Sequence, residues 1–185
     1  MTATTVQRSP ETQEAIELLT ELLKGFTARH EDLQVNGADA GPSKSILAVK
    51  CHPWDYPKVV GKQGKNHWSL QRILTAIGAR QGRLVEFTLL PSERREKGPD
   101  EFRPDPKWKP GPILLLLNRV LSMAMGPGEY VAKCDQTPEL ATLVVIVDEV
   151  TGELMELAQA THAIFHAIGK TQGRKVTVEF REAKK

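Results

Sequence analysis

The sequence predicts an α+β fold built from two successive small domains, and three observations lead to this fold class. The segment "AIGARQGR", residues 76–83, returns as "AIGKTQGR", residues 167–174. Each copy follows apolar residues at helical spacing and precedes an alternating segment typical of a strand. Between the two halves, residues 91–112 are rich in proline and charge, which favours an extended linker. A repeated helix–turn–strand unit therefore indicates two copies of one plan.

The first domain is predicted over residues 11–90, after a flexible N-terminus at 1–10. Ser9 can cap a helix whose first residue is Pro10, and an apolar stripe follows along that helix. A short strand is expected around 33–35, a turn-rich loop at 36–44 and a second strand at 45–51. Two short helices, the second starting near Lys65, and a final strand at 84–90 complete the domain. Its order is therefore helix, strand, strand, helix, helix, strand.

The second domain, residues 113–182, is predicted to repeat this order. It begins with a very apolar helix at 113–125, and strands are expected around 129–134, 141–148 and 175–180. The first helix is apolar over much of its circumference, as a helix buried on more than one side would be. The same surface would also suit a protein partner or a second copy of the chain.

The composition excludes several classes of protein. A chain of 185 residues with 40% hydrophobic content can bury a core, and a net charge of +2 does not by itself indicate a polyanionic partner. The N-terminal segment has no apolar core of signal-peptide type, and the longest apolar run, residues 113–117, is too short to span a bilayer. We therefore expect a cytoplasmic protein without a membrane segment.

Metal sites and catalytic groups are not expected either. Cys51 and Cys134 lack the spacing of a CxxC motif, which suits reduced thiols. His162 and His166 stand four residues apart on a predicted helix, but they lie off its apolar stripe, are expected in solvent and have no obvious third ligand. No catalytic serine, nucleophilic cysteine or pair of carboxylates stands out, so the sequence predicts neither an enzyme nor a cofactor.

The stretch "VVGKQGKNHW", residues 59–68, is the strongest candidate for a functional site. It combines lysines, glycines and a tryptophan without an acidic residue. Glycines at 61 and 64 would let a phosphodiester backbone approach closely, and the N-terminus of the following helix is suited to bind an anion. The alternative is an ordinary helix–helix turn with solvated lysines, because a Gly-x-x-Gly pattern alone is not specific.

The charge distribution separates the two domains. The charged residues of the window 58–83 are all basic, and they are Lys58, Lys62, Lys65, Arg72, Arg80 and Arg83. The matching window, residues 149–174, holds three glutamates against Lys170 and Arg174. The Gly-x-x-Gly segment aligns there with Gly152-Glu153-Leu154-Met155, and a carboxylate repels phosphate. The sequence therefore predicts an active first domain and an inactive second domain.

With this element order, and with Gly61-Lys62-Gln63-Gly64 between two short helices, the first domain resembles a type II KH domain. The resemblance is closest to the small bacterial KH proteins that bind RNA, and the second domain resembles a degenerate copy. It implies two tandem KH-like domains, each a three-stranded sheet with helices packed on one face. It also implies non-catalytic binding of single-stranded RNA, whose phosphate backbone the loop would clamp. The RNA-binding residues expected from it are Lys58, Val60, Gly61, Lys62, Gln63, Gly64, Lys65, Asn66, His67, Trp68 and Arg72.

Several roles stay open at this point. Trp68 would either stack on a base or pack against the linker or the other domain, and His67 would either touch RNA or be partly packed. Trp54 and Tyr56 would either close the groove beside the loop or cap the core. The second domain would be structural or bind a partner. The alternative functions are a protein-interaction module on a KH scaffold and binding of single-stranded DNA.

Overall fold

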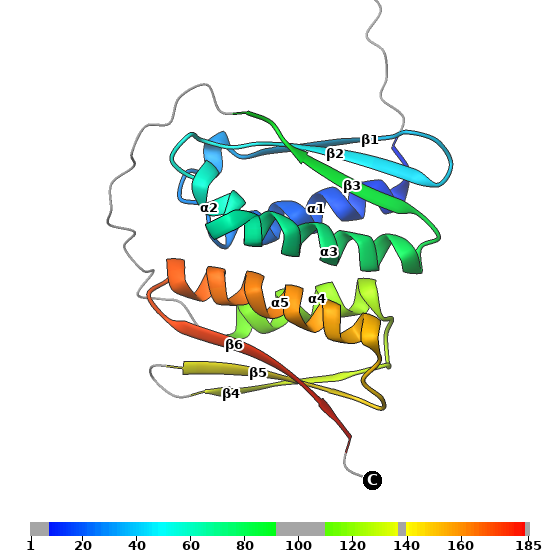
Figure 1. The fold of residues 1–185 in the computed structure, drawn as a ribbon, viewed down its shortest axis with the longest axis vertical. Helices are drawn as coiled ribbons and strands as arrows, with labels where there is room; N and C mark the ends of the chain where they lie inside the picture. Colours follow the sequence, from blue (N-terminus) through cyan, green and yellow to red (C-terminus); the bar gives the residue numbers. More distant parts are fainter. Residues whose placement is uncertain (1–7, 92–109, 137–139, 184–185) are drawn as a thin grey trace, which may run out of the picture.

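The computed structural model describes residues 8–91, 110–136 and 140–183. Two three-stranded sheets enclose two layers of helices, and the helices of the first half face those of the second (Figure 1). The elements of the first half are α1 (Pro10–Lys24), β1 (Gln34–Asp39), β2 (Lys44–Lys50), α2 (Tyr56–Val60), α3 (Lys65–Arg80) and β3 (Leu84–Leu89), with short 3₁₀ turns η1 (His30–Asp32) and η2 (Lys62–Gly64). The elements of the second half are α4 (Pro110–Ala124), β4 (Val131–Gln136), β5 (Leu140–Val147), α5 (Gly152–Thr171) and β6 (Lys175–Glu182).

The two sheets have the same topology. In the first, β1 pairs with β2 in antiparallel fashion and β2 pairs with β3 in parallel, so that Ser45 lies opposite Val85. In the second, β4, β5 and β6 repeat these directions, and Ala141 lies opposite Val176. A parallel pair needs a crossover, which α2 and α3 supply in one half and α5 in the other. The predicted α+β class is therefore confirmed.

The repeated segment has a structural explanation in both halves. A Cβ on Gly78 would lie 2.5 Å from the carbonyl oxygen of Arg83, and a Cβ on Gly169 would lie 2.5 Å from Val176 Cγ2. Glycine is therefore needed at each position, where the helix packs against the following strand. The second glycine of each copy, at 82 and 173, takes a positive φ that closes the turn. The repeat thus encodes a tight helix-to-strand connection.

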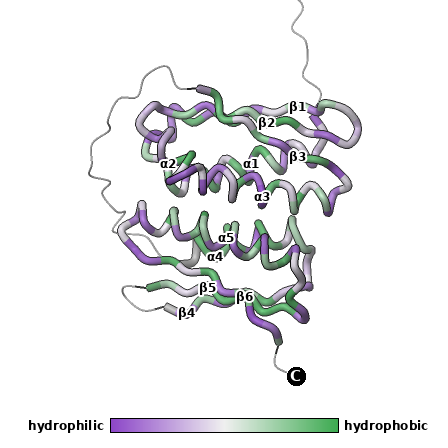
Figure 2. The backbone as a smooth tube through the Cα atoms, viewed as in Figure 1, coloured by the Kyte–Doolittle hydropathy of each residue, from purple (hydrophilic) through white to green (hydrophobic). Residues whose placement is uncertain are grey.

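Buried apolar side chains of both halves form one connected core. Leu18, Leu19, Leu22 and Leu23 of α1 are fully buried, as are Leu117, Val120 and Leu121 of α4. Figure 2 shows hydrophobic residues on α4 and on β5, whereas β6 ends in hydrophilic residues. Each such side chain contributes about 1.5–3 kcal/mol when it is removed from water. Because α4 contacts α3 and α1 as well as β4, the prediction that this helix is buried on more than one side is confirmed.

Ion pairs join the two halves at the edge of this core. Arg119 of α4 binds Glu17 at 3.1 Å and Glu21 at 2.7 Å, and Arg72 of α3 binds Glu156 of α5. Such pairs at a partly exposed interface contribute about 0–1 kcal/mol each, so the apolar core supplies most of the cohesion. Some of the charged residues that distinguish the two halves therefore pair with each other across the interface.

Strand β1 is longer than the strand predicted around 33–35. The prediction of a loop at 36–44 is wrong for its first part, because β1 continues through Gly37 to Asp39. Gly37 pairs with Leu47, and a Cβ on it would lie 2.5 Å from Leu47 Cδ2 and 3.0 Å from Ile16 Cδ1. The turn-forming residues thus lie in a strand that passes close over α1.

The structure also corrects three boundaries. The second half has one continuous helix, α5, where two helices were predicted. Helix α4 begins at Pro110, inside the predicted linker. Residues 92–109 of that linker and residues 1–7 of the predicted flexible N-terminus lie outside the described residues. Ser9 belongs to the fold, because its hydroxyl oxygen accepts a hydrogen bond from the Thr12 amide and caps α1.

Asp39 ties the start of α1 to the sheet. The pKa of the Asp39 carboxyl lies below its usual value, chiefly because the Thr12 hydroxyl donates a hydrogen bond to it. Hydrogen bonds from the Ser9 amide and hydroxyl and the charge of Arg83 lower this pKa further. This carboxylate therefore stays ionised near neutral pH and anchors the N-terminus of α1 to the end of β1.

Candidate nucleic-acid interface

Asp55 fixes the start of the helix that leads into the loop. Its side chain is fully buried, accepts hydrogen bonds from the amides of Ala28 at 3.0 Å and Arg29 at 2.9 Å, and lies 3.2 Å from Lys58 Nζ. These contacts join the connection after α1 to the first turn of α2. Burial, together with the nearby charge of Asp55, raises the pKa of the Cys51 thiol to about 11, so this thiol is neutral near pH 7.

The Gly-x-x-Gly loop has a backbone that requires its glycines. Gly61 has φ 74° and ψ 171°, a conformation essentially limited to glycine. Gln63 and Gly64 are left-handed, with φ 55° and 77°. Asn66 fills the space beside Gly61, because a Cβ there would lie 2.7 Å from Asn66 Cγ and 2.8 Å from its backbone nitrogen. The Asn66 side chain donates to the Lys58 carbonyl at 2.7 Å and so holds the loop closed.

The N-terminus of α3 is uncapped, unlike those of α1 and α5. No described side chain forms a capping hydrogen bond at the start of α3, whereas Thr151 accepts one from Leu154 at the start of α5. The first amides of a 16-residue helix therefore lack a side-chain acceptor there and carry partial positive charge. Lys62, Gln63 and Lys65 are exposed around this end. The arrangement suits a phosphate group.

The remaining predicted residues lie around the loop in different environments. Val60 is half-buried at the end of α2, and His67 is half-buried with its ring centroid 4.5 Å from that of Phe87. Trp68 is exposed, whereas Arg72 is half-buried and paired with Glu156. The exposed polar groups next to the loop are thus those of residues 62, 63 and 65.

Gln71 is a positioning residue that the sequence analysis did not identify. Its side chain donates to the Val85 carbonyl at 2.8 Å and accepts from the Phe87 amide at 3.0 Å, which locks α3 to the edge strand β3. His162, at the matching position of the repeat, is half-buried, and its Nδ1 lies 3.2 Å from both the carbonyl oxygen and the amide nitrogen of Val178, so that it can bond one of these two groups. The expectation that His162 lies in solvent is therefore wrong, whereas His166 is exposed. The polar residues at these two matching positions of the repeat were the sequence signal that could have identified this contact.

The two aromatic residues before the loop differ in their contacts. Tyr56 packs against the core. The guanidinium of Arg29 lies 4.7 Å from the Trp54 ring centroid, and the His52 ring lies 5.0 Å from it on edge. Tyr56 thus takes the core role that the sequence left open, whereas Trp54 belongs to a half-buried cluster before α2.

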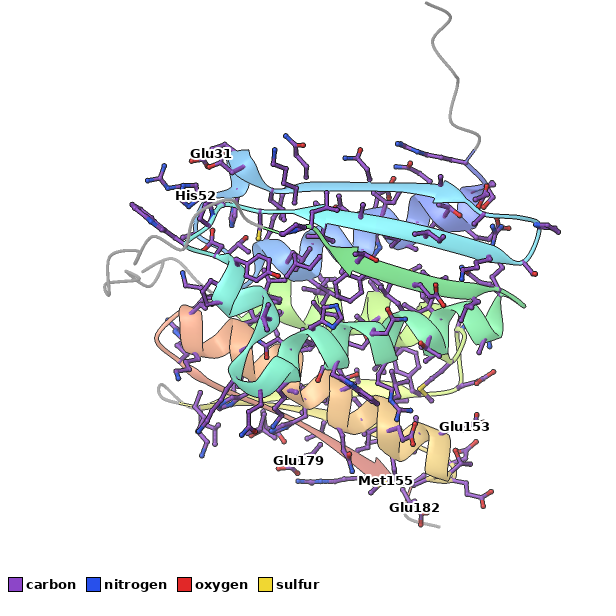
Figure 3. The ribbon with its side chains drawn as sticks, turned by 45° about the horizontal axis from the view of Figure 1, so that its top comes forward. Glu31, His52, Glu153, Met155, Glu179 and Glu182 are labelled. Atoms are coloured by element: carbon purple, nitrogen blue, oxygen red, sulfur yellow. The ribbon has the colours of Figure 1, made fainter. Side chains whose placement is uncertain are left out.

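The matching segment of the second half forms an ordinary helix start. Gly152 begins α5, and Glu153 and Met155 lie in its exposed first turn. Figure 3 shows these two side chains at the far end of the helix layer from His52. A carboxylate and a side-chain cap occupy the helix end where the first half has lysines and no side-chain cap.

Within the described ranges, no group of three or more His, Cys, Asp and Glu side chains is placed to hold a metal ion. None of the helices described there is long and apolar enough to cross a bilayer.

We expect the two loop glycines to differ in their tolerance of alanine. Gly64→Ala places a Cβ in open space at a left-handed position and should lower the free energy of unfolding by about 1–2 kcal/mol. Gly61→Ala adds a contact with Asn66 to a glycine-only conformation and should cost about 2–4 kcal/mol. Urea denaturation of both variants measures the difference. Equal losses would contradict the loop geometry described here.

The element order of the first half, with a glycine loop before an uncapped helix, defines a KH-type protein. The chain is similar to the RNA-binding protein KhpA of Streptomyces coelicolor, to which it is 34% identical over 64 residues, 35% of this chain and 80% of that protein. It matches the RNA-binding protein KhpA of Streptomyces lividans to the same extent. The chain therefore belongs to the KH-type family of RNA-binding proteins that includes KhpA. No protein-family model matches the chain.

Proposed function

We propose that this protein binds single-stranded RNA without catalysis and that residues 61–65 clamp the phosphate backbone. The observation that carries the proposal is the uncapped N-terminus of α3 behind a loop whose glycines leave its backbone accessible. The name of the KhpA relatives gives the same class of ligand. A phosphate at this end would accept hydrogen bonds from backbone amides and pair with Lys62 and Lys65.

Around this clamp, four more of the predicted residues are given a role. Asn66 keeps the loop closed, and His67 lies on the side of α3 that faces β3, where its ring contacts that of Phe87. Val60 and Lys58 belong to the helix that leads into the loop, where Asp55 pairs with Lys58. The sequence of the RNA is read by contacts other than the phosphate clamp, because backbone contacts carry no base information.

The second half is proposed to be a degenerate KH-like domain that has kept the sheet and lost the loop. Support comes from its identical strand order and from the Thr151 cap and Glu153 at the start of α5. Its role in this proposal is structural, because its helices cover α1 and α3 of the first half. We infer a cytoplasmic protein, and the Streptomyces origin of the relatives favours a bacterial one.

Competition experiments test the single-stranded preference. A fluorescein-labelled single-stranded RNA pool bound to the whole chain is challenged with unlabelled single-stranded RNA, single-stranded DNA of matched sequence or duplex RNA. Single-stranded RNA should displace the probe at the lowest concentration, because a duplex cannot present a free backbone and splayed bases to one narrow loop. Equal competition by DNA would assign the alternative ligand. A chain that binds none of the three would favour the protein-interaction module instead.

A further inference from the structure

Trp68 lies in the first turn of α3, four residues after Gly64, and its side chain is 62% exposed. Among the described residues it is the aromatic side chain that is left largely in solvent. The rise of an α-helix places it about 6 Å along the axis from the loop glycine. A large apolar ring therefore stands beside the proposed phosphate clamp and contributes little to the core.

This ring is held by a chain of contacts that reaches the second half. The guanidinium of Arg72, one helical turn further on, lies 4.7 Å from the Trp68 ring centroid. Arg72 also forms an ion pair with Glu156 in α5. Glu156 thus fixes Arg72, and Arg72 fixes one side of the indole ring.

The helical positions explain why the ring stays accessible. His67 and Gln71 occupy the face of α3 that contacts β3, and Arg72 and Arg80 occupy the face that pairs with the second half. At 100° per residue, Trp68 falls between these two faces, on the solvent side of the helix. A strand that leaves the clamp along this side of α3 would meet the ring.

We propose that Trp68 is a stacking platform for a nucleobase of the clamped strand and that Glu156 positions this platform through Arg72. The inference rests on the proposed function of the loop, and it gives the second half a part in RNA binding. Because every base has a π-face, the platform would accept bases of any type. Arg72 acts here as a support for the ring, since its charge is already paired with that of Glu156.

Binding of the labelled single-stranded RNA pool, followed by anisotropy over a salt series and by tryptophan fluorescence, tests the platform. Trp68→Leu should weaken binding about 5- to 150-fold, the range that base–aromatic stacking gives, without changing the salt slope. Trp68→Phe should keep most of the affinity and lose the RNA-dependent quenching of tryptophan emission. An affinity for Trp68→Leu equal to that of the wild type would overturn the platform.

A double-mutant cycle tests the positioning role of Glu156. Glu156→Gln is compared with Glu153→Gln, which removes the same charge from an exposed position of the same helix. We expect Glu156→Gln to bind RNA about two- to fivefold more weakly than Glu153→Gln, which is the range of an exposed ion pair. In a Trp68→Leu background, Glu156→Gln should cause no further loss of RNA affinity. Tighter binding with a steeper salt slope would instead identify Arg72 as a phosphate contact and overturn the positioning role.

The same series separates this inference from the proposed function. If the double variant Lys62→Asp, Gln63→Asp binds as well as the wild type, the proposed clamp itself is wrong. If that variant loses binding whereas the Trp68 and Glu156 variants behave like their controls, only the platform and its support are wrong.

Discussion

Replacing Lys62 and Gln63 together by aspartate is expected to remove most RNA binding and to leave the fold intact. The two carboxylates would lie at the uncapped N-terminus of α3, where they repel phosphate and compete for the same amides. Like charges brought together at a binding site cost several kcal/mol, so we expect affinity to fall about 100-fold or more. Anisotropy of the labelled RNA pool measures the loss.

Folding should not suffer, for reasons that the loop geometry provides. Both side chains are exposed, acidic groups stabilise a helix N-terminus, and aspartate tolerates the left-handed backbone found at Gln63. A control with the same change of charge, Gln159→Asp with Lys175→Asp, alters exposed positions of the second half. If the control loses as much affinity as the loop variant, net charge and not the loop would govern binding.

Asp55→Ala is expected to have the largest effect on stability among the polar substitutions considered. The change leaves the amides of Ala28 and Arg29 without the carboxylate that accepts from them and removes the ion pair between Asp55 and Lys58. Breaking a buried hydrogen-bonded charge costs about 3–5 kcal/mol. Because Asp55 also anchors α2, RNA affinity should fall along with stability.

Chemical denaturation of Asp55→Ala, Asp55→Asn and the wild type measures this effect. Asparagine keeps one acceptor oxygen, so its loss should lie between those of the other two. Asp32→Ala, at an exposed position of η1, should change the free energy of unfolding by less than about 0.5 kcal/mol. An Asp55→Ala chain as stable as this control would show that the buried carboxylate does not hold the loop in place.

The sequence was informative wherever a local pattern has one structural meaning. The repeated "AIG…QGR" segments predicted two helix–turn–strand units because close packing and a left-handed turn both demand glycine at fixed positions. The loop at 61–64 was recognisable for the same reason. The family resemblance, which rested on this loop, is supported by the KhpA relatives.

Contacts between segments far apart in the sequence could not be predicted from local sequence patterns. Gly37 looked like a loop residue because its partners, Leu47 and Ile16, come from two other elements. Met155 stands where the first half has Gly64, and α5 runs through this position without a break. The alignment showed that the glycine was lost, but it did not show that the helix would continue there. The basic residues of α3 looked like one surface for phosphate, yet Arg72 and Arg80 face acidic partners in the second half.

An amide NMR titration of the whole chain with single-stranded RNA would locate the RNA site residue by residue. We expect the largest shifts on the amides of residues 61–68, around the loop and the first turn of α3. Those of residues 151–155, which form the capped start of α5, should stay unchanged. Large shifts at 151–155, with the loop amides unmoved, would contradict the assignment of the RNA site to the first half.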